Sequence, residues 1–483
     1  MAEREQGLLP PGDLGPRILR NTAIQAVGRN LVALARMVTI AVIVRRYGAD
    51  TFGEYAIMIA LLQVAEGVAD FGTTEVFVRD VSRDPGKATW YLRVLTAAKA
   101  LQVPAAFAVL VAAVYLIGYP AHLAEAILLA GTSLVFFAGV TVYRVIFKAT
   151  LSMEREIVPE FVSVLVMIAL VVAAADGGLL TIALCHVASR AVFFAGCYIL
   201  GRDRFRPSVV GVTRADVFRG LAGSAAIGAA GFLVMVYEAL DVLFLSRLAT
   251  AGDVALYSAA QRLAWPLLMA LAAVGGSMYP LLASLWPHSP EEFSRTCRRG
   301  LNGMLAAGGL ALSGALAGAE FLLGLLGPGM SDGAAAFRVL LLLCVSKAVS
   351  MTIGPALLVV KAQKAILLLV AVALIAKAAV IAPVAAHFGY VGVAWAALLV
   401  DVLFVELPAL YLVHRYTGFR PDWWVAGRLA GSVVVAAFLP GMLLPPGSLA
   451  AACAAAVLYG ALAVLSGGVT LAELRRLAKR SAA

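Results

Sequence analysis

Apolar segments about as long as a bilayer is thick follow one another along almost the whole sequence. An α-helix needs about 20 mostly apolar residues to cross the hydrocarbon core of a membrane. This criterion predicts about fourteen spans, near residues 22–44, 52–77, 94–117, 123–147, 157–177, 179–200, 220–245, 254–282, 300–326, 335–360, 365–386, 390–413, 425–443 and 447–467. The expected fold class is all-α, in a polytopic integral membrane protein.

The composition agrees with a membrane protein. Hydrophobic residues make up 62% of the 483 residues and charged residues 14%, whereas a soluble globular chain is about half apolar and about a quarter charged. A soluble protein of this size could not bury so much apolar surface, so the excess must face lipid. The net charge of +10 fits basic loops on the cytoplasmic side of a membrane, and we expect no nucleic-acid partner.

Basic residues gather in alternate loops, and this pattern predicts the orientation. If the N-terminus is placed inside, the inside segments contain basic clusters within 79–93, 202–219 and 475–480, among others. The outside loops contain only Arg45, Arg46, Arg247 and Arg338. Because Lys and Arg accumulate in cytoplasmic loops, both termini are expected in the cytoplasm. Two compensating errors in the span count would preserve this pattern, so twelve and fourteen spans both remain open.

The first half of the chain resembles the second half. A shift of 202 residues places 22–57 on 224–259 without gaps, with Arg45 on Arg247 and Tyr55 on Tyr257. Six spans, an even number, separate the two copies, so both copies enter the membrane in the same direction. We therefore expect two parallel six-helix lobes, with a substrate path between them and alternating access by rocking.

The expected domains follow from this repeat. They are a cytoplasmic tail at 1–20, an N-lobe with spans 1–6 at 21–206, a C-lobe with spans 7–12 at 207–420, two extra spans at 421–468 and a basic cytoplasmic tail at 469–483. Two cytoplasmic segments are predicted as short helices at the membrane interface. One has Thr213 and Asp216 in capping-box spacing, and the other has Ser289 as its N-cap.

Three arginines inside predicted spans are candidates for substrate binding. A charged side chain at mid-bilayer costs about 2.5–3.5 kcal/mol or more, and it persists where it pairs, lines water or contacts substrate. Arg29 and Arg36 lie seven residues apart, on one face of span 1, and Arg262 lies in span 8. A guanidinium donates hydrogen bonds in a planar fork that suits phosphate, so these residues indicate an anionic substrate and a cationic lumen.

Acidic residues inside spans are candidates for ion coupling or for a gate, namely Glu66 and Asp70 in span 2 and Glu238 and Asp241 in span 7. The repeat places Arg36 on Glu238, so we hypothesise that Arg36 pairs with Glu238 or Asp241 across the path. A permanent structural ion pair is the alternative. The other charged residues in spans are scattered: Lys99, Arg190, Lys347, Lys377, Asp401, Glu406 and Glu320. For the lysines among them we expect snorkelling or structural pairing.

Motifs of catalysis are missing from the sequence. There is no G-x-x-x-x-G-K-[ST] phosphate-binding loop, so the chain itself is not expected to hydrolyse ATP. The five histidines do not cluster or show metal-ligand spacing. We therefore expect a transporter or flippase rather than an enzyme, with no catalytic residue, metal or cofactor.

Two loops carry a family resemblance. Span 1 ends in VRRYGADTFGEYAIMIAL, span 2 ends in DFGTTEVFVRD, and the second half echoes the first loop in ATAGDVALYSAAQRLAWPLL. Gly48, Phe52, Gly53 and Tyr55 match the Gly-x-x-x-(Tyr/Phe)-Gly-x-Tyr loop of prokaryotic polysaccharide exporters. The sequence thus resembles the Wzx-like branch of the multidrug/oligosaccharidyl-lipid/polysaccharide (MOP) exporter superfamily, over about residues 20–415 in layout. The extra pair of spans occurs only in some branches, including lipid II flippases.

The resemblance implies a fold and a function. The fold is two six-helix lobes forming a V around a central cavity, with the first helix of each lobe lining it. The function is to flip an oligosaccharide linked to undecaprenyl pyrophosphate from the cytoplasmic to the outer leaflet of a bacterial or archaeal cell membrane. Expected partners are this lipid-linked substrate, membrane lipids and proteins of polysaccharide polymerisation or assembly.

Other functions stay open at this point. A gradient-driven multidrug or cation antiporter of the same superfamily would use carboxylates such as Glu66 and Asp70, although the arginines argue against a cationic substrate. A membrane enzyme of glycan assembly would need an exposed catalytic surface, and the outside loops are short. A membrane scaffold would leave the intramembrane charges unexplained.

Overall fold

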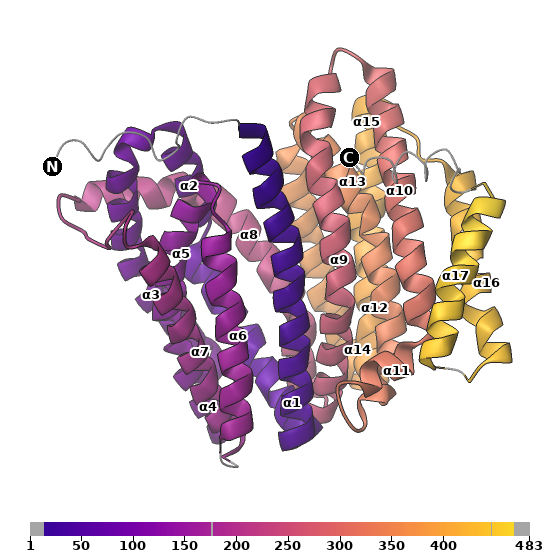
Figure 1. Cartoon of the computed structure of the whole chain (residues 1–483), viewed down its shortest axis with the longest axis horizontal. Helices are drawn as coiled ribbons and strands as arrows, with labels where there is room; N and C mark the ends of the chain where they lie inside the picture. The colour runs from indigo at the N-terminus through magenta and orange to yellow at the C-terminus, as the bar shows by residue number, and fades with distance from the viewer. Residues whose placement is uncertain (1–13, 175–176, 446, 468–483) are drawn as a thin grey trace. The chain divides into compact units, whose positions relative to one another are not determined.

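The computed structural model describes residues 14–174, 177–445 and 447–467, and within these ranges the chain is helical, without β-strands (Figure 1). Contacts divide the chain into two compact units, Met1–Ala255 and Leu256–Ala483, which we call the N-terminal and C-terminal units. The expected lobe boundary at 206/207 stays a prediction. Helix α1 begins at Leu14, inside the expected tail 1–20, and the expected tail 469–483 lies outside the described residues.

The N-terminal unit is a helix bundle. Helix α1 packs against α3, α6 and α8, and α7 packs against α4, α5 and α6. Two of the largest fully buried side chains of its core, Tyr143 and Phe147, come from α5. The helices are α1 (Leu14–Asp70), α2 (Thr73–Arg83), η2 (Pro85–Lys87), α3 (Ala88–Ile117), α4 (Ala121–Gly131), α5 (Leu134–Ala149), α6 (Glu154–Ala173), α7 (Gly178–Gly201) and α8 (Arg214–Leu248).

Helix α1 bends at Gly48 and therefore contains two of the predicted spans. Gly48 has a φ of 87°, a conformation that glycine adopts far more readily than residues with a Cβ. A Cβ on Gly53 would lie 1.9 Å from the carbonyl oxygen of Ala251, so the close approach of these two segments requires glycine. Phe52 and Tyr55 are buried. The loop that carries the family resemblance thus forms the packed turn between the first two spans.

A second break interrupts the predicted span 52–77. Helix α1 ends at Asp70, α2 begins at Thr73, and the intervening Phe71 and Gly72 have φ values of 36° and 74°. A helix end leaves its last carbonyls without intrahelical partners. Such a break is tolerated at membrane depth only where other protein groups satisfy the freed backbone. The residues that do so here belong to the candidate site below.

The C-terminal unit begins within α9 (Ala251–Leu285). Helix α14 bends at Gly389, where φ is 59°, and this bend separates the predicted spans 365–386 and 390–413. The remaining elements are α10 (Pro290–Ala317), α11 (Ala319–Gly324), η3 (Met330–Gly333), α12 (Ala334–Ser346), α13 (Ala348–Val359), α14 (Gln363–Asp401), the π-helix η4 (Val402–Glu406), α15 (Leu407–Thr417), α16 (Trp423–Leu443) and α17 (Leu449–Leu465).

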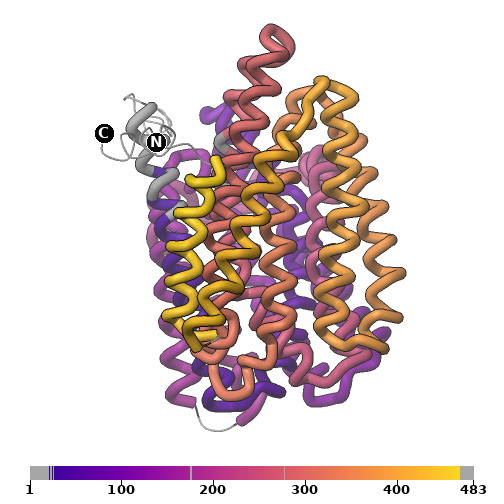
Figure 2. Tube along the Cα trace, turned by 90° about the vertical axis from the view of Figure 1, so that its right-hand side faces the viewer, coloured from indigo at the N-terminus to yellow at the C-terminus, as the bar shows by residue number. Residues whose placement is uncertain are grey.

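The last two helices form an antiparallel pair, drawn in yellow in Figure 2, and both pack on α10. Small residues allow this contact: a Cβ on Gly309 of α10 would lie 2.4 Å from the hydroxyl oxygen of Tyr459. That hydroxyl donates a 3.1 Å hydrogen bond to the carbonyl oxygen of Ala306. The two extra spans are thus attached to the C-terminal unit mainly through α10, and the N–H of Phe321 in α11 also donates to the carbonyl oxygen of Gly447 in the loop between them at 3.0 Å.

The span prediction agrees with the structure. Among the described residues, 11 helical segments are long and apolar enough to cross a membrane, and two of them, Val27–Arg83 and Gln363–Thr417, contain the bends at Gly48 and Gly389. The shorter apolar helix Leu449–Leu465 lies where the last span is expected. Counting each bent segment as two crossings and adding this helix is consistent with fourteen spans.

The two segments expected as separate interface helices are the first turns of long helices instead. Thr213 and Asp216 form the predicted capping box, but α8 then continues unbroken to Leu248. Helix α10 likewise begins after Ser289 and continues to Ala317. The capping signals therefore located the helix starts correctly, and the separation from the following spans was wrong because no residue there ends the helix.

Candidate functional site

Charged side chains inside the N-terminal unit pair from one helix to another. The pairs connect α1 with α6, α7 and α3, and α5 with α6. Four of these pairs are Arg36–Glu160 at 2.6 Å, Glu66–Arg190 at 2.6 Å, Asp70–Lys99 at 3.1 Å and Arg144–Glu156 at 2.7 Å. We call this set the N-terminal ion-pair network. It places each of these acids opposite a basic partner in a medium where an isolated charge is costly.

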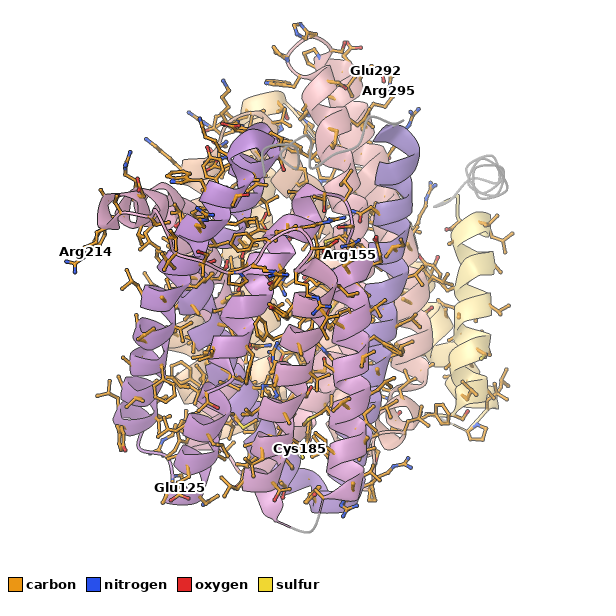
Figure 3. The ribbon with its side chains drawn as sticks, turned by 60° about the vertical axis from the view of Figure 1, so that its left-hand side comes forward. Glu125, Arg155, Cys185, Arg214, Glu292 and Arg295 are labelled. Carbon is orange, nitrogen blue, oxygen red and sulfur yellow. The ribbon has the colours of Figure 1, made fainter. Side chains whose placement is uncertain are left out.

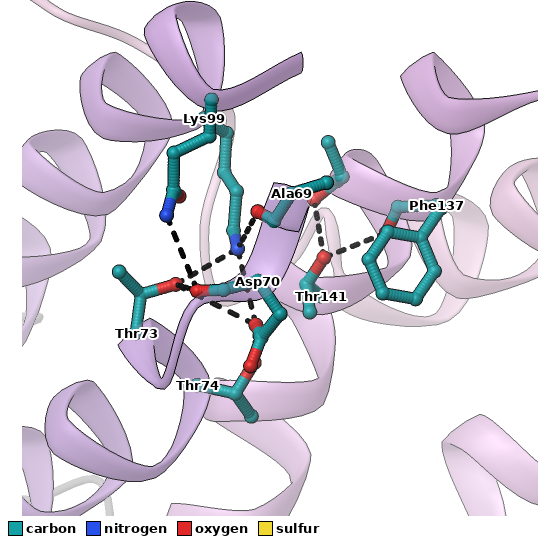
Figure 4. A network of polar contacts seen from close by, with 9 residues as sticks. Ala69, Asp70, Thr73, Thr74, Lys99, Phe137 and Thr141 are labelled. Atoms are coloured by element: carbon teal, nitrogen blue, oxygen red, sulfur yellow. Dashed lines mark hydrogen bonds and ion pairs between the residues drawn. The ribbon is translucent and has the colours of Figure 1, made fainter. Parts of the chain in front are cut away.

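Lys99 occupies the break between α1 and α2 (Figure 4). Its Nζ atom donates hydrogen bonds to the carbonyl oxygen of Ala69 at 2.8 Å, to Oγ1 of Thr73 at 2.8 Å and to Oδ1 of Asp70 at 3.1 Å. The lysine side chain is only 4% exposed. One ammonium group thus satisfies a carbonyl freed by the helix break and also neutralises the carboxylate that ends α1.

Asp70 has further partners at the same break. Nε2 of Gln102 donates to its backbone oxygen at 3.2 Å, and Oγ1 of Thr73 donates to that oxygen at 2.5 Å. The hydroxyl of Thr74 donates to Oδ1 of its carboxylate. The site therefore combines a broken membrane helix, a carboxylate and a buried ammonium, a combination found where transporters bind ions or substrates.

Two other pairs of the network contain the charges that act on His186. Arg36 of α1 contacts Glu160 of α6, and Glu66 of α1 contacts Arg190 of α7. The imidazole of His186, on α7, is buried and lies close enough to Arg190 and Arg36 to feel both charges. His186, one of five histidines that do not cluster in the sequence, is therefore part of a charged environment.

Arg144 extends the network toward the helix break. It binds Glu156, whose side chain is only 2% exposed, and its charge acts on Asp70 and Glu160 as well. The pairs are thus close enough to influence one another electrostatically. A change of charge at one of them alters the stability of the others, because charge interactions in a poorly solvated region are weakly screened.

The predicted substrate-binding arginines of span 1 are accessible. Arg29 and Arg36 are both exposed, and the side chain of Arg36 retains 55% of its exposure although it pairs with Glu160. The exposed apolar residues of the same stretch form a separate stripe at helical spacing, namely Val27, Leu31, Leu34 and Val38. Helical geometry puts this stripe on nearly the opposite face from the two arginines.

The structure does not support the predicted partner of Arg36. Its ion-pair partner among the described residues is Glu160, and not Glu238 or Asp241. Those two residues lie on α8, Glu238 exposed and Asp241 buried. Alignment of the two halves predicted the wrong pair because α1 packs against α6 as well as α8, and α6 supplies the carboxylate of Glu160 next to Arg36.

Arg262 lies in the C-terminal unit, so its place beside Arg29 and Arg36 stays a prediction.

Several residues of the network were not singled out from the sequence as site residues. Lys99 and Arg190 were grouped with the scattered charges, with snorkelling or structural pairing expected for the lysine, and they are the partners of Asp70 and Glu66. Glu156 and Glu160 were overlooked, although their i, i+4 spacing at the start of span 157–177 places both on one helix face. Pairing between distant spans has no local spacing signal, so only the structure identifies the partners.

Labelled side chains mark the two ends of the N-terminal unit. Arg155 and Arg214 lie toward one end, and Glu125 lies toward the other, with Cys185 (Figure 3). Nη1 of Arg155 donates to the carbonyl oxygen of Leu200 at 2.7 Å. Which end faces the cytoplasm stays a prediction.

In the part of the chain that the structure describes, no three His, Cys, Asp or Glu side chains gather as metal ligands would.

Comparison with known proteins identifies the family. The profile of the polysaccharide biosynthesis protein family matches residues 18–286. No curated protein matches the sequence. A solved structure described as "Lipid II flippase MurJ, inward closed conformation" is similar with a TM-score of 0.76 at 10% identity, covering 92% of this chain and 98% of that one.

Two other transporters share the fold with lower TM-scores. The MATE multidrug transporter DinF-BH has a TM-score of 0.60 at 17% identity, covering 83% of this chain and 96% of its own. A MOP superfamily transporter from Pyrococcus furiosus has a TM-score of 0.57 at 13% identity, covering 86% and 99%. The fold is similar to that of MurJ and the MATE transporters. Because the family profile matches more than half of the chain, this protein belongs to the polysaccharide biosynthesis protein family.

Proposed function

We propose that this protein flips an oligosaccharide linked to undecaprenyl pyrophosphate from the cytoplasmic to the outer leaflet of the cell membrane. The family to which the chain belongs is named for polysaccharide biosynthesis, and a protein of similar fold is described as a lipid II flippase. The first name concerns polysaccharides, and the second concerns the transfer of a lipid between leaflets. In this proposal the partners are the lipid-linked substrate, membrane lipids and the proteins that polymerise or assemble the sugar, and both termini are cytoplasmic.

The observation that carries the proposal is the accessible pair of arginines on α1. Arg29 is exposed and has no ion-pair partner among the described residues, and Arg36 keeps half of its surface free. A pyrophosphate linker carries negative charge and acceptor oxygens that match guanidinium donors. We propose that these two arginines, together with Arg262, contact the pyrophosphate during its passage.

The acids of the N-terminal unit support an anionic rather than a cationic cargo. Glu66, Asp70, Glu156 and Glu160 each have a basic partner at 3.1 Å or less. A cationic drug that bound one of these carboxylates would have to displace a lysine or arginine from a poorly solvated site. The cation antiporter alternative is therefore disfavoured for this unit, although MATE transporters share the fold.

Asp70 is the residue that we propose for ion coupling or gating. It ends α1 at the helix break, and its carboxylate holds Lys99 there. Protonation of this carboxylate would release the ammonium and loosen the joint between α1 and α2. Glu66, Glu238 and Asp241 remain further candidates for coupling, each on a helix that packs within the same unit.

The test is leaflet exchange in liposomes by the purified protein and its variants. A fluorescent undecaprenyl-pyrophosphate oligosaccharide is placed in one leaflet, and its movement is followed by quenching from outside. Arg29→Ala is the first variant because it breaks no ion pair, and we expect at least about a tenfold loss of exchange rate, equivalent to about 1.4 kcal/mol. Arg29→Lys should retain part of the rate because the positive charge remains.

Arg214→Ala is the matched control. Arg214 is also an exposed arginine, but it lies at the end of the unit and points outward (Figure 3). Its removal should leave the exchange rate unchanged. If Arg29→Ala and Arg214→Ala both exchange the lipid at the wild-type rate, Arg29 does not contact the pyrophosphate. The exposed arginines of α1 would then no longer support the proposed function.

A further inference from the structure

The C-terminal unit contains two buried acids at an irregular point of its helices. Helix α14 ends at Asp401, and the next five residues form the π-helix η4, which ends at Glu406. The side chain of Asp401 is 1% exposed, and Glu406 as a residue is 3% exposed. The segment lies inside the apolar stretch Gln363–Thr417. Both acids are therefore at membrane depth and away from water.

The π-helix determines the directions in which the side chains of Asp401 and Glu406 leave the helix axis. In an α-helix, residues five apart lie about 140° apart around the axis. The wider turn bonds the N–H of Leu407 to the carbonyl oxygen of Val402, an i→i+5 bond that brings residues five apart to nearly the same side. Pro408 explains the irregularity, because its ring lacks an N–H and clashes with the carbonyl four residues earlier in a regular helix. π-Bulges of this kind are frequent at functional sites.

Lys347 neutralises one of the two acids. It lies at the junction of α12 and α13, and its Nζ atom is 2.9 Å from Oδ1 of Asp401. This contact ties the α12–α13 junction to the end of α14. The ammonium provides a single positive charge, so it can balance one carboxylate and not two.

Glu406 is poorly partnered for a buried carboxylate. Among the described residues, no donor reaches either of its side-chain oxygens in good hydrogen-bond geometry, although the hydroxyl of Ser350 and the carboxyl of Asp401 lie nearby. Its surroundings are Asp401 of α14, Lys347 at the α12–α13 junction and Ser350 of α13, and Cys344 of α12 is the further titratable group beside Lys347 and Asp401. An ionised carboxylate without hydrogen bonds in an apolar medium is strongly disfavoured.

We propose that Asp401 and Glu406 form a proton-binding site of the C-terminal unit. The two carboxyl groups together hold one proton, taken from water, and Lys347 balances the remaining negative charge. Uptake converts one carboxylate to a carboxylic acid, and release returns the proton to water as hydronium. A proton fits better than a metal cation, since the ammonium 2.9 Å from Asp401 repels a metal ion and a proton needs no set of oxygen ligands.

The position of the site gives proton binding a mechanical consequence. Its groups come from the α12–α13 junction and from the junction of α14 with α15, which are separate elements. Loss of the proton leaves two carboxylates beside Lys347, and the repulsion between the two carboxylates favours hydration or movement of one junction. The site thus gives the transporter a place where a proton gradient acts, and it does not depend on which cargo is carried.

Infrared difference spectroscopy of the full-length purified protein tests the site. A buried protonated carboxyl group gives a carbonyl band that shifts in D₂O, and we expect this band in the wild type at neutral pH. In Glu406→Gln the remaining Asp401 pairs with Lys347 as a carboxylate, so the band should be lost. In Asp401→Asn, Glu406 takes over Lys347, so the band should be lost again. Loss in both variants is the signature of one shared proton.

The control is Glu292→Gln, an acid of α10 that pairs with Arg295 and is 51% exposed. It should keep the band. Persistence of the band in both Glu406→Gln and Asp401→Asn would overturn the proposal. So would stabilisation of the wild type, but not of Glu406→Gln, by added sodium at constant pH, because the site would then hold a metal cation. None of these results depends on lipid-linked sugar, so they are distinct from failure of the flippase proposal.

Discussion

Substitution of Lys99 by methionine tests whether the helix break depends on its ion pair. The change keeps most of the side-chain volume but removes the ammonium that binds Asp70 and the Ala69 carbonyl. Removal of one partner from a buried ion pair costs about 3–5 kcal/mol, because the other charge is left uncompensated. The Asp70 side chain retains 23% of its exposure, which allows some hydration, so we expect the lower end, about 3 kcal/mol.

A double-variant cycle separates the pair from other effects. Asp70→Asn leaves the ammonium with two neutral acceptors, and the combined variant leaves no charge at the break. The combined variant should therefore be more stable than the sum of the single effects predicts, by more than about 1 kcal/mol, a coupling expected for residues in direct contact. The measurement is the free energy of unfolding in detergent, by denaturant titration followed with circular dichroism.

The matched control is Lys87→Met. Lys87 also pairs with an acid at 3.1 Å, Asp84, but the two side chains are 67% and 40% exposed. An exposed pair contributes little, so the unfolding midpoint should not move. Strictly additive effects of Lys99→Met and Asp70→Asn, or equal effects of Lys99→Met and Lys87→Met, would refute the reasoning that burial makes the pair essential.

Three further changes probe other parts of the fold. Gly53→Ala places a Cβ against the Ala251 carbonyl and should cost about 1–3 kcal/mol, as overpacking does, measured as a lower thermal midpoint. Arg144→Met leaves the 2% exposed side chain of Glu156 without a cation, and we expect about 3–5 kcal/mol from denaturant titration. Tyr459→Phe removes the hydrogen bond from α17 to α10 and should cost about 1 kcal/mol, read as a shift in midpoint without loss of expression.

Each of these changes has an outcome that contradicts it. Gly223→Ala in α8 meets no atom within 4 Å, so a loss as large as that of Gly53→Ala would show that the close contact is not the cause. If the Arg144→Met protein is as stable as the wild type, burial of an unpaired Glu156 carboxylate does not destabilise the fold. A Tyr459→Phe protein without a measurable shift would show that α17 is held by apolar packing alone.

The spans were predictable because lipid imposes a strong and local rule on the sequence. Every predicted span overlaps a described helix, including the last one, Leu449–Leu465. The capping box at Thr213 was likewise recognisable from four consecutive residues. Where the sequence was misleading, as in the separate interface helix expected there, no residue signals whether a helix stops or continues.

The candidate site was predictable only in part. Asp70 and Glu66 stood out as acids in an apolar span, but their partners Lys99 and Arg190 come from other helices at no fixed spacing. The break at Gly72 was not predicted because a single glycine does not distinguish a bend from a straight helix. The pairing of Arg36 was wrong for the same reason, since several helices compete for one guanidinium and packing decides between them.

The most direct test of the proposed function uses the wild-type protein alone. Liposomes that contain the purified protein are given a fluorescent undecaprenyl-pyrophosphate oligosaccharide in one leaflet and, in parallel, an organic cation with a proton or sodium gradient. The account predicts leaflet exchange of the lipid-linked sugar above that of protein-free liposomes, and no gradient-driven movement of the cation. Movement of the cation without exchange of the lipid-linked sugar would contradict the account and establish the cation antiporter instead.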